Sequence, residues 1–191
     1  IDTCLEDART TPLEKQEETM RKALDKLMDL NRDTVQLPDE VKETLRPALE
    51  AARAAAGESA SITRVEQLHF TLVFLGETER LDDAAAAAEA VRAWPPFELA
   101  IGSRGAFPNM SRPRVLWIGA TDGAAALTKL AETLSAGLRE RGFKLEDRAF
   151  QPHLTLGRAK PNGAQQARRA LETLPKSTLA KFTVRGFALV Q

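Results

Sequence analysis

The chain has 191 residues, of which 43% are hydrophobic and 28% charged, as in an ordinary soluble globular protein. Its 27 Lys and Arg residues are balanced by 27 Asp and Glu residues, which argues against a protein that tracks long nucleic acid through a basic surface. The single cysteine, Cys4, excludes an internal disulfide. The sequence shows neither a secretory signal nor a membrane-spanning run, so we expect a cytoplasmic location.

The N-terminal part of the chain is predicted to be helical. Residues 11–32 place Leu and Met at helical spacing among good helix formers. A second helix begins near Leu37-Pro38-Asp39-Glu40, where Pro occupies the first turn and the acids lie at the positive end of the helix dipole. Apolar residues then recur every four positions until Gly57-Glu58-Ser59 breaks the pattern.

The rest of the chain alternates between strands and helices. The expected strands are residues 68–75, 97–101, 114–118, 150–156 and 181–190, with a loop over 102–113. The expected helices are residues 81–93, 123–141 and 163–174. Because several strands carry polar residues on one face, the pattern favours an α+β fold with antiparallel sheets.

Both histidines of the chain lie in the same short pattern. The two copies are Leu68-His69-Phe70-Thr71-Leu72 and Pro152-His153-Leu154-Thr155-Leu156. Residues i and i+2 of a strand point to the same face, so each copy sets an imidazole beside a hydroxyl and leaves apolar residues on the other face. A lone strand histidine is usually structural, but two in one repeated pattern favour a catalytic pair in two duplicated halves.

Paired imidazoles suit acid and base catalysis at a phosphodiester, since one can be neutral while the other is charged near pH 7. The hydroxyls of Thr71 and Thr155 could donate to phosphate oxygens, and the guanidinium of Arg158 could add a charged fork. Arg158 lies an odd number of residues after His153, so it reaches the same face only if Gly157 permits a bulge. Otherwise Arg158 is a solvated charge at a strand end. Two histidines without a third ligand make a zinc site improbable.

These motifs resemble the 2H phosphoesterases, and within them the bacterial and archaeal RNA 2',3'-cyclic phosphodiesterases, historically called 2'-5' RNA ligases. Further similar segments are Leu37–Val41, Leu68–Gly76, Gly105–Pro108, Arg112–Trp117 and Phe150–Arg158. The resemblance implies a bilobal α+β fold, in which two antiparallel sheets face a central cleft and the helices lie outside. It also implies that RNA 2',3'-cyclic phosphate ends are opened to 2'-phosphomonoesters without metal or cofactor. His69 would be the general acid and His153 the general base, with Thr71, Thr155 and Arg158 binding the phosphate.

The resemblance also defines the expected domain organisation. Residues 34–191 form the 2H phosphoesterase domain with two pseudo-symmetric lobes, and residues 1–33 form a helical extension of a different kind. The family carries a short apolar strand before the Leu-Pro helix, whereas Asn31–Gln36 is polar and poor in strand formers. The family also adds a hairpin after the strand that corresponds to residues 181–190. We therefore expect sheet strands to be missing or rearranged at both ends.

Three alternatives stay open from the sequence. The protein could bind nucleotides or RNA ends as a module without turnover, or it could carry out 2'-5' RNA ligation as a side activity. It is expected to be a monomer, with the 1–33 helix as a possible contact for a partner or a second copy. The expected partner is RNA or a nucleotide with a 2',3'-cyclic phosphate end, and neither a membrane nor a metal is expected.

Overall fold

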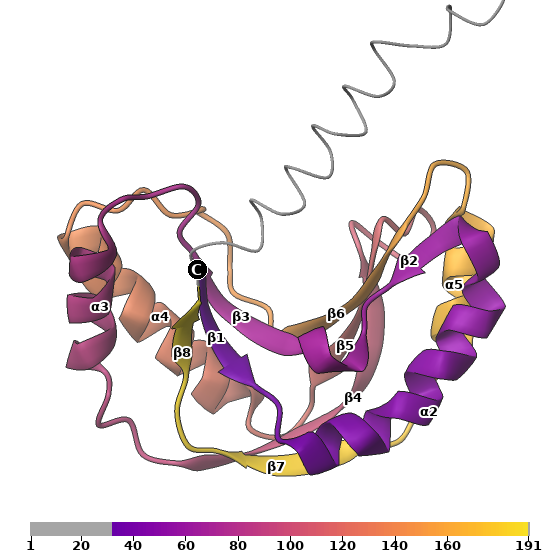
Figure 1. Ribbon diagram of the computed structural model, residues 1–191, viewed down its shortest axis with the longest axis horizontal. Helices are drawn as coiled ribbons and strands as arrows, with labels where there is room; N and C mark the ends of the chain where they lie inside the picture. Colours follow the sequence, from indigo (N-terminus) through magenta and orange to yellow (C-terminus); the bar gives the residue numbers. More distant parts are fainter. Residues whose placement is uncertain (1–31, 191) are drawn as a thin grey trace, which may run out of the picture.

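The computed structural model describes residues 32–190, which form one curved antiparallel sheet flanked by helices (Figure 1). The strands are β1 (Arg32–Gln36), β2 (Ala60–Ile62), β3 (His69–Phe74), β4 (Phe97–Phe107), β5 (Val115–Ala120), β6 (His153–Ala159), β7 (Ala180–Val184) and β8 (Ala188–Val190). The helices are α2 (Asp39–Ala56), α3 (Leu81–Ala90), α4 (Ala124–Glu140) and α5 (Ala164–Glu172). The helix predicted over residues 11–32 lies outside the described residues, except for Arg32, which belongs to β1.

The four helices confirm the helical periodicity read from the sequence. In α2 the spacing of Val41, Leu45 and Leu49 buries one face, and the helix ends at Gly57, whose φ of 53° suits glycine. Helices α3 and α4 pack together at one end of the sheet, and α2 and α5 pack together at the other (Figure 1). Within the described residues, no helix is both long enough and apolar enough to cross a membrane.

The sheet runs in the order β7-β4-β5-β6-β3-β1-β8, and β2 pairs with β6 beyond this path. Every described pairing is antiparallel, as the sequence predicts. The two sheets implied by the resemblance are joined here into one, because Phe70 of β3 pairs with Leu154 of β6. Between these two strands the ladder consists of that single pair, so the two halves of the sheet meet at one point.

The structure corrects the expectation that the segment before the Leu-Pro helix lacks a strand. Residues 32–36 form β1, which lies between β3 and β8. Thr34 and Val35 are 0% and 1% exposed, so the two neighbouring strands bury this segment despite its polar composition. Strand propensity depends strongly on such tertiary context.

Three further boundaries differ from the sequence prediction. Strand β4 continues to Phe107, through part of the expected 102–113 loop. The expected final strand over residues 181–190 is divided into β7 and β8 by residues 185–187. The short strand β2 is an addition, and it pairs with β6 through Ala60, Ser61 and Ile62.

Candidate active site

The two His-x-Thr motifs occupy equivalent places on neighbouring strands. His69 opens β3 and His153 opens β6. Each motif alternates in burial, with the histidine and threonine half-buried on one face and an apolar residue, Phe70 or Leu154, 0% exposed on the other. The strand alternation predicted from the sequence therefore holds in both copies.

The pairing of Phe70 with Leu154 relates the two motifs to each other. Continuing this antiparallel register by one residue in each direction sets His69 opposite Thr155 and Thr71 opposite His153. The two motifs are thus related by an approximate two-fold axis through the central pair, which brings both histidines to the place where β3 and β6 meet.

Both imidazoles are oriented by the same backbone hydrogen bond. The Nδ1 atom of His69 lies 2.7 Å from the carbonyl oxygen of Gln67, and Nδ1 of His153 lies 2.7 Å from that of Gln151. A carbonyl oxygen only accepts hydrogen bonds, so Nδ1 carries the hydrogen and donates in each case. Proton exchange with a substrate therefore falls to Nε2 of each ring.

A bulge in β6 returns Arg158 to the face of the motif. Thr155 pairs with Trp117 of β5, whereas Gly157 pairs with Leu116, so β6 has one extra residue between them. Arg158 then pairs with Val115, which shares a face of β5 with Trp117. The bulge that Arg158 needs in order to share a face with His153 is therefore present in β6.

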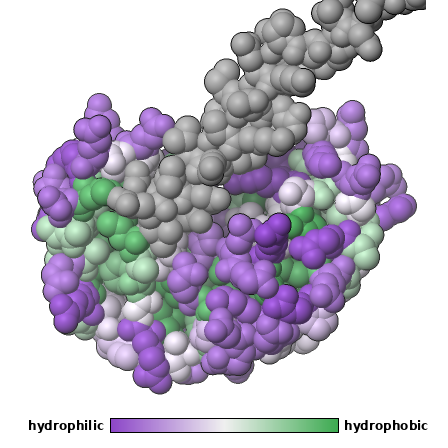
Figure 2. Space-filling view, in the orientation of Figure 1, coloured by the Kyte–Doolittle hydropathy of each residue, from purple (hydrophilic) through white to green (hydrophobic). Residues whose placement is uncertain are grey.

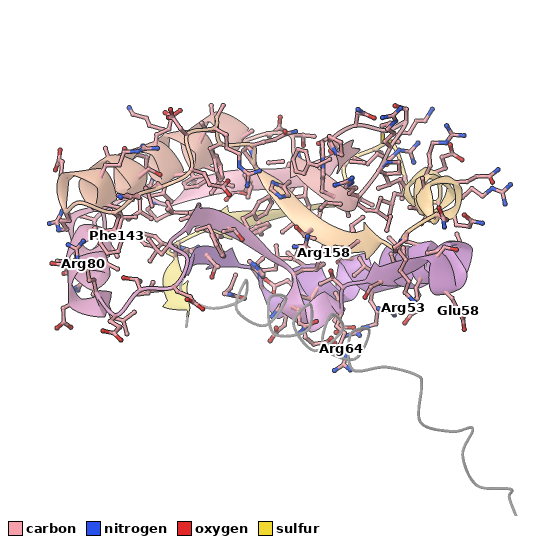
Figure 3. The ribbon with its side chains drawn as sticks, turned by 90° about the horizontal axis from the view of Figure 1, so that it is seen from above. Arg53, Glu58, Arg64, Arg80, Phe143 and Arg158 are labelled. Carbon is pink, nitrogen blue, oxygen red and sulfur yellow. The ribbon has the colours of Figure 1, made fainter. Side chains whose placement is uncertain are left out.

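Glycine is needed at this bulge. A Cβ atom at Gly157 would lie 2.4 Å from the backbone oxygen of Ser61 on β2. In Figure 3 Arg158 lies beside β6 in the middle of the molecule, whereas Arg80 and Phe143 lie at the α3 end. Arg158 is exposed and lies on the same strand as His153.

The first motif contains the matching bulge. Pairing between β1 and β3 slips between Asp33 and Thr34, because Thr34 pairs with Thr71 while Asp33 pairs with Val73. The position that follows this bulge, equivalent to that of Arg158, is occupied by Phe74. The two halves of the site therefore share a backbone plan but differ in side chains.

Aromatic side chains surround His153. The ring of Phe107 lies 5.0 Å from the imidazole in an edge-on arrangement, and the indole of Trp117 lies 6.4 Å from it. Burial in these surroundings lowers the pKa of His153 from its ordinary value, since it disfavours the charged form. The hydrogen bond to the Gln151 carbonyl acts in the opposite direction, and the positive charge of Arg148 lowers the pKa further.

Two glycines make room for the indole of Trp117. A Cβ atom at Gly105 of β4 would lie 2.2 Å from a carbon of the indole, so the ring lies directly against the backbone there. A Cβ atom at Gly119 would lie 3.0 Å from the same ring. The indole thus lies across β4 and β5 beside His153.

The segment that leads into β6 brings a further cation to the site. Arg148 lowers the pKa of His153 through its charge, and its guanidinium pairs with Glu146 at 2.6 Å. Within residues 32–190, no three His, Cys, Asp or Glu side chains lie close enough together to hold a metal ion. The donors at the site are therefore imidazoles, hydroxyls and guanidinium groups.

A separate apolar pocket lies away from these residues. It is lined by α3, the start of β4 and the segment around β8, with Trp94, Phe97, Phe187 and Leu189 among its side chains. Figure 2 shows hydrophobic surface on this side of the molecule, between the places of α3 and β8 in Figure 1. None of the candidate catalytic or phosphate-binding residues lines this pocket.

Comparison with known proteins shows the family to which this chain belongs. Residues 37–191 match the family model described as the 2'-5' RNA ligase superfamily. The chain belongs to this superfamily. A protein of Archaeoglobus fulgidus named RNA 2',3'-cyclic phosphodiesterase is 33% identical over 166 residues, which cover 82% of this chain and 87% of that protein. A Thermus thermophilus protein of the same name is 35% identical over 164 residues, covering 81% of this chain and 77% of its own.

Solved structures of the superfamily share the fold. A Thermus thermophilus protein of known crystal structure superposes with a TM-score of 0.69 at 31% identity, covering 84% of this chain and 87% of its own. Escherichia coli LigT in its apo form superposes with a TM-score of 0.60 at 26% identity, covering 83% of this chain and 84% of its own. The chain is therefore an α+β member of the 2H phosphoesterases.

Three side chains near His153 were not predicted as site residues from the sequence. Phe107 and Trp117 were noted only within segments that resemble the family, as a loop residue and a strand residue, and Arg148 was not singled out. Each is brought to His153 by strand pairing or by the preceding loop. Trp117 alternates with Val115 and Gly119 along its strand, which indicates that these three residues share a face. This pattern does not identify the residue of the neighbouring strand that lies beside Trp117.

Proposed function

We propose that this protein hydrolyses RNA 2',3'-cyclic phosphate ends to 2'-phosphomonoesters by acid and base catalysis with His69 and His153. The observation that supports the proposal most directly is the repeated arrangement of the two motifs. Two imidazoles with the same Nδ1 hydrogen bond each precede one member of the single residue pair that joins β3 to β6. Relatives at 33% and 35% identity that are named RNA 2',3'-cyclic phosphodiesterase support the substrate class.

The proposed roles follow from the surroundings of each ring. His153 acts as general base, because its lowered pKa keeps Nε2 unprotonated near neutral pH. It takes a proton from a water molecule as the water oxygen attacks phosphorus. The bond between phosphorus and O3' breaks, and O3' receives a proton from Nε2 of His69. The product carries a 2'-phosphate and a free 3'-hydroxyl, and no metal or cofactor takes part in these steps.

Thr71, Thr155 and Arg158 are proposed to bind the phosphate. The two hydroxyls lie on the histidine face, and the bulge turns Arg158 to that face as well. Hydroxyl and guanidinium hydrogens can donate to the non-bridging oxygens, where negative charge increases as water attacks. We propose that the two halves of the sheet form the two walls of the cleft that holds this phosphate.

The remaining expectations extend this proposal. Residues 34–191, together with Arg32 and Asp33 of β1, would form the catalytic domain, and the residues before β1 would be a separate extension. The protein would be monomeric and in the cytoplasm. Ligation of 2'-5' linked RNA would be the same chemistry in reverse. Water competes strongly with a ribose hydroxyl, so ligation is proposed only as a side activity.

The test is hydrolysis of a nucleoside 2',3'-cyclic phosphate with EDTA present, with the product identified by phosphorus NMR. We expect a 2'-phosphate product and a bell-shaped dependence of kcat/KM on pH. Either His69→Gln or His153→Gln should abolish turnover while binding of the product nucleotide is retained. If the wild type bound the nucleotide but showed no turnover, the protein would be a nucleotide-binding module and not an enzyme.

A further inference from the structure

The strand next to the first motif places polar side chains beside His69. Strand β1 pairs Gln36 with His69 and Thr34 with Thr71. Cross-strand partners share a face of the sheet, so Gln36 lies on the side of the imidazole. The Gln36 side chain is exposed, as expected for a residue at the mouth of a site.

The strand next to the second motif offers no such group. Strand β5 pairs Gly119 with His153 and Trp117 with Thr155. A Cβ atom at Gly119 would lie 2.4 Å from Oγ of Ser103, so this position excludes a side chain. The two histidines therefore differ in surroundings, with an amide beside one and glycine and an indole beside the other.

The orientation of the Gln36 amide is fixed by a short chain of hydrogen bonds. Thr34, which is 0% exposed, donates its hydroxyl hydrogen to the carbonyl oxygen of Ala188 at 3.5 Å. The carbonyl oxygen of Ala188 only accepts hydrogen bonds, so the hydroxyl hydrogen of Thr34 is directed to it. Oγ1 of Thr34 in turn accepts a hydrogen bond from Nε2 of Gln36 at 3.0 Å. The amide nitrogen is thus held at Thr34, on the face that β1 shares with His69.

We propose that Gln36 is a positioning residue that keeps His69 protonated through its amide oxygen, and so assigns the acid role to His69 in the reaction proposed above. An amide oxygen only accepts hydrogen bonds and carries partial negative charge, which favours the imidazolium over the neutral ring. The equivalent place beside His153 holds Gly119, so the base receives no such stabilisation. Two motifs with the same backbone geometry thereby take different catalytic roles, acid for His69 and base for His153.

Among residues 32–190, the charged groups on the elements next to His69 are not altered when Gln36 is changed. His153 and Arg158 lie on the facing strand β6, and Arg64 and Glu66 lie in the segment before β3. The Glu66 carboxylate is already paired with Arg46 of α2 at 3.2 Å. A change in the pKa of His69 between variants at position 36 therefore reports on the side chain at that position.

The experiment is an NMR titration of the imidazole Cε1–H signals in the full chain. The chain has only two histidines, so His153→Gln assigns both signals. In Gln36→Leu we expect the pKa of His69 to fall by about 0.5–1 unit, and in Gln36→Glu to rise by about 1 unit, because a carboxylate favours the cation more strongly. The pKa of His153 should stay unchanged, as should both values in the control Gln165→Leu, an exposed glutamine on α5.

Kinetics give an independent readout. In kcat/KM for a nucleoside 2',3'-cyclic phosphate, the alkaline limb should move to lower pH in Gln36→Leu and to higher pH in Gln36→Glu, while the acid limb stays in place. An unchanged His69 titration in both variants would overturn the inference, as would a shift at His153 alone. Absence of hydrolysis by the wild type would refute the proposed function instead, and the titration would still decide the role of Gln36.

Discussion

Phe70 of β3 and Leu154 of β6 form the single pair that joins the two halves of the sheet, and both side chains are 0% exposed. Each lies one residue after a candidate catalytic histidine. Their contact therefore links the core to the site, because the packing that buries these two side chains also sets the spacing of His69 and His153.

Shortening one member of this pair should weaken both fold and site. We expect Leu154→Ala to lower the free energy of unfolding by about 2–5 kcal/mol, since it removes a fully buried side chain and leaves a cavity. Urea denaturation at 25 °C measures the change. Met110→Ala is the control, because Met110 is 39% exposed and its loss should change the free energy by about 0.5 kcal/mol or less. A loss in Leu154→Ala no greater than in the control would contradict the assignment of this pair.

The position of the Trp117 indole ring beside His153 depends on Gly105. We expect Gly105→Ala to lower the free energy of unfolding by about 1–3 kcal/mol, because its Cβ would overlap the indole of Trp117. In a Trp94→Phe background, tryptophan fluorescence reports only Trp117, and its emission should shift as the ring is displaced. Gly186→Ala is the matched control, since a Cβ there meets nothing within 4 Å. If Gly105→Ala and Gly186→Ala changed the free energy of unfolding equally, the indole of Trp117 could move aside without loss of stability.

Much of the fold was predictable because its signals are local. The apolar spacing of α2 and α4 and the alternation of β3 and β6 are present in single segments of sequence. Strand β1 was missed because the segment is mostly polar and contains Asp33, a poor strand former, and only pairing with β3 and β8 makes the segment a strand. The sequence pattern within the β1 segment does not indicate which strands pair with it on either side.

The same distinction applies to the candidate site. The His-x-Thr spacing and the need for a bulge before Arg158 follow from strand geometry within one motif. The positions of Phe107 and Trp117 against His153 depend on the register between β4, β5 and β6, which the sequence alone does not specify. The same holds for Gln36, whose place beside His69 follows from the register of β1 on β3.

The lowered pKa of His153 links folding stability to pH. In the folded chain this pKa lies below its ordinary value of 6.5, whereas in the unfolded chain the imidazole is exposed. Between the two values the unfolded chain binds more protons, so the free energy of unfolding rises with pH there. Stability from this group is therefore fully present above about pH 6.5 and is lost as the pH falls through the folded pKa.

Substitution of His153 should remove this dependence. We expect the loss of unfolding free energy between pH 7.5 and pH 5.5 to be smaller in His153→Gln than in the wild type, as measured by urea denaturation at both values. His69→Gln is the comparison. Because Gln36 is proposed to favour the protonated ring of His69, removing that ring should leave the loss as large as in the wild type or make it larger. If both variants behave alike, the pH dependence belongs to other groups and the acid limb of kcat/KM cannot be assigned to His153.

Arg158 offers the sharpest test of how the phosphate is held. If its guanidinium binds the charge that develops in the transition state, Arg158→Ala should lower kcat/KM by about 10²–10³-fold, mainly through kcat. Arg158→Lys should recover only part of this loss, since a point charge replaces a planar fork that can bind two oxygens at once. Arg92→Ala is the control, because Arg92 is 77% exposed and pairs only with Glu89 among the described ion pairs. A raised KM with unchanged kcat would instead show that Arg158 binds substrate and transition state equally, and catalysis would then rest on the two histidines and two threonines alone.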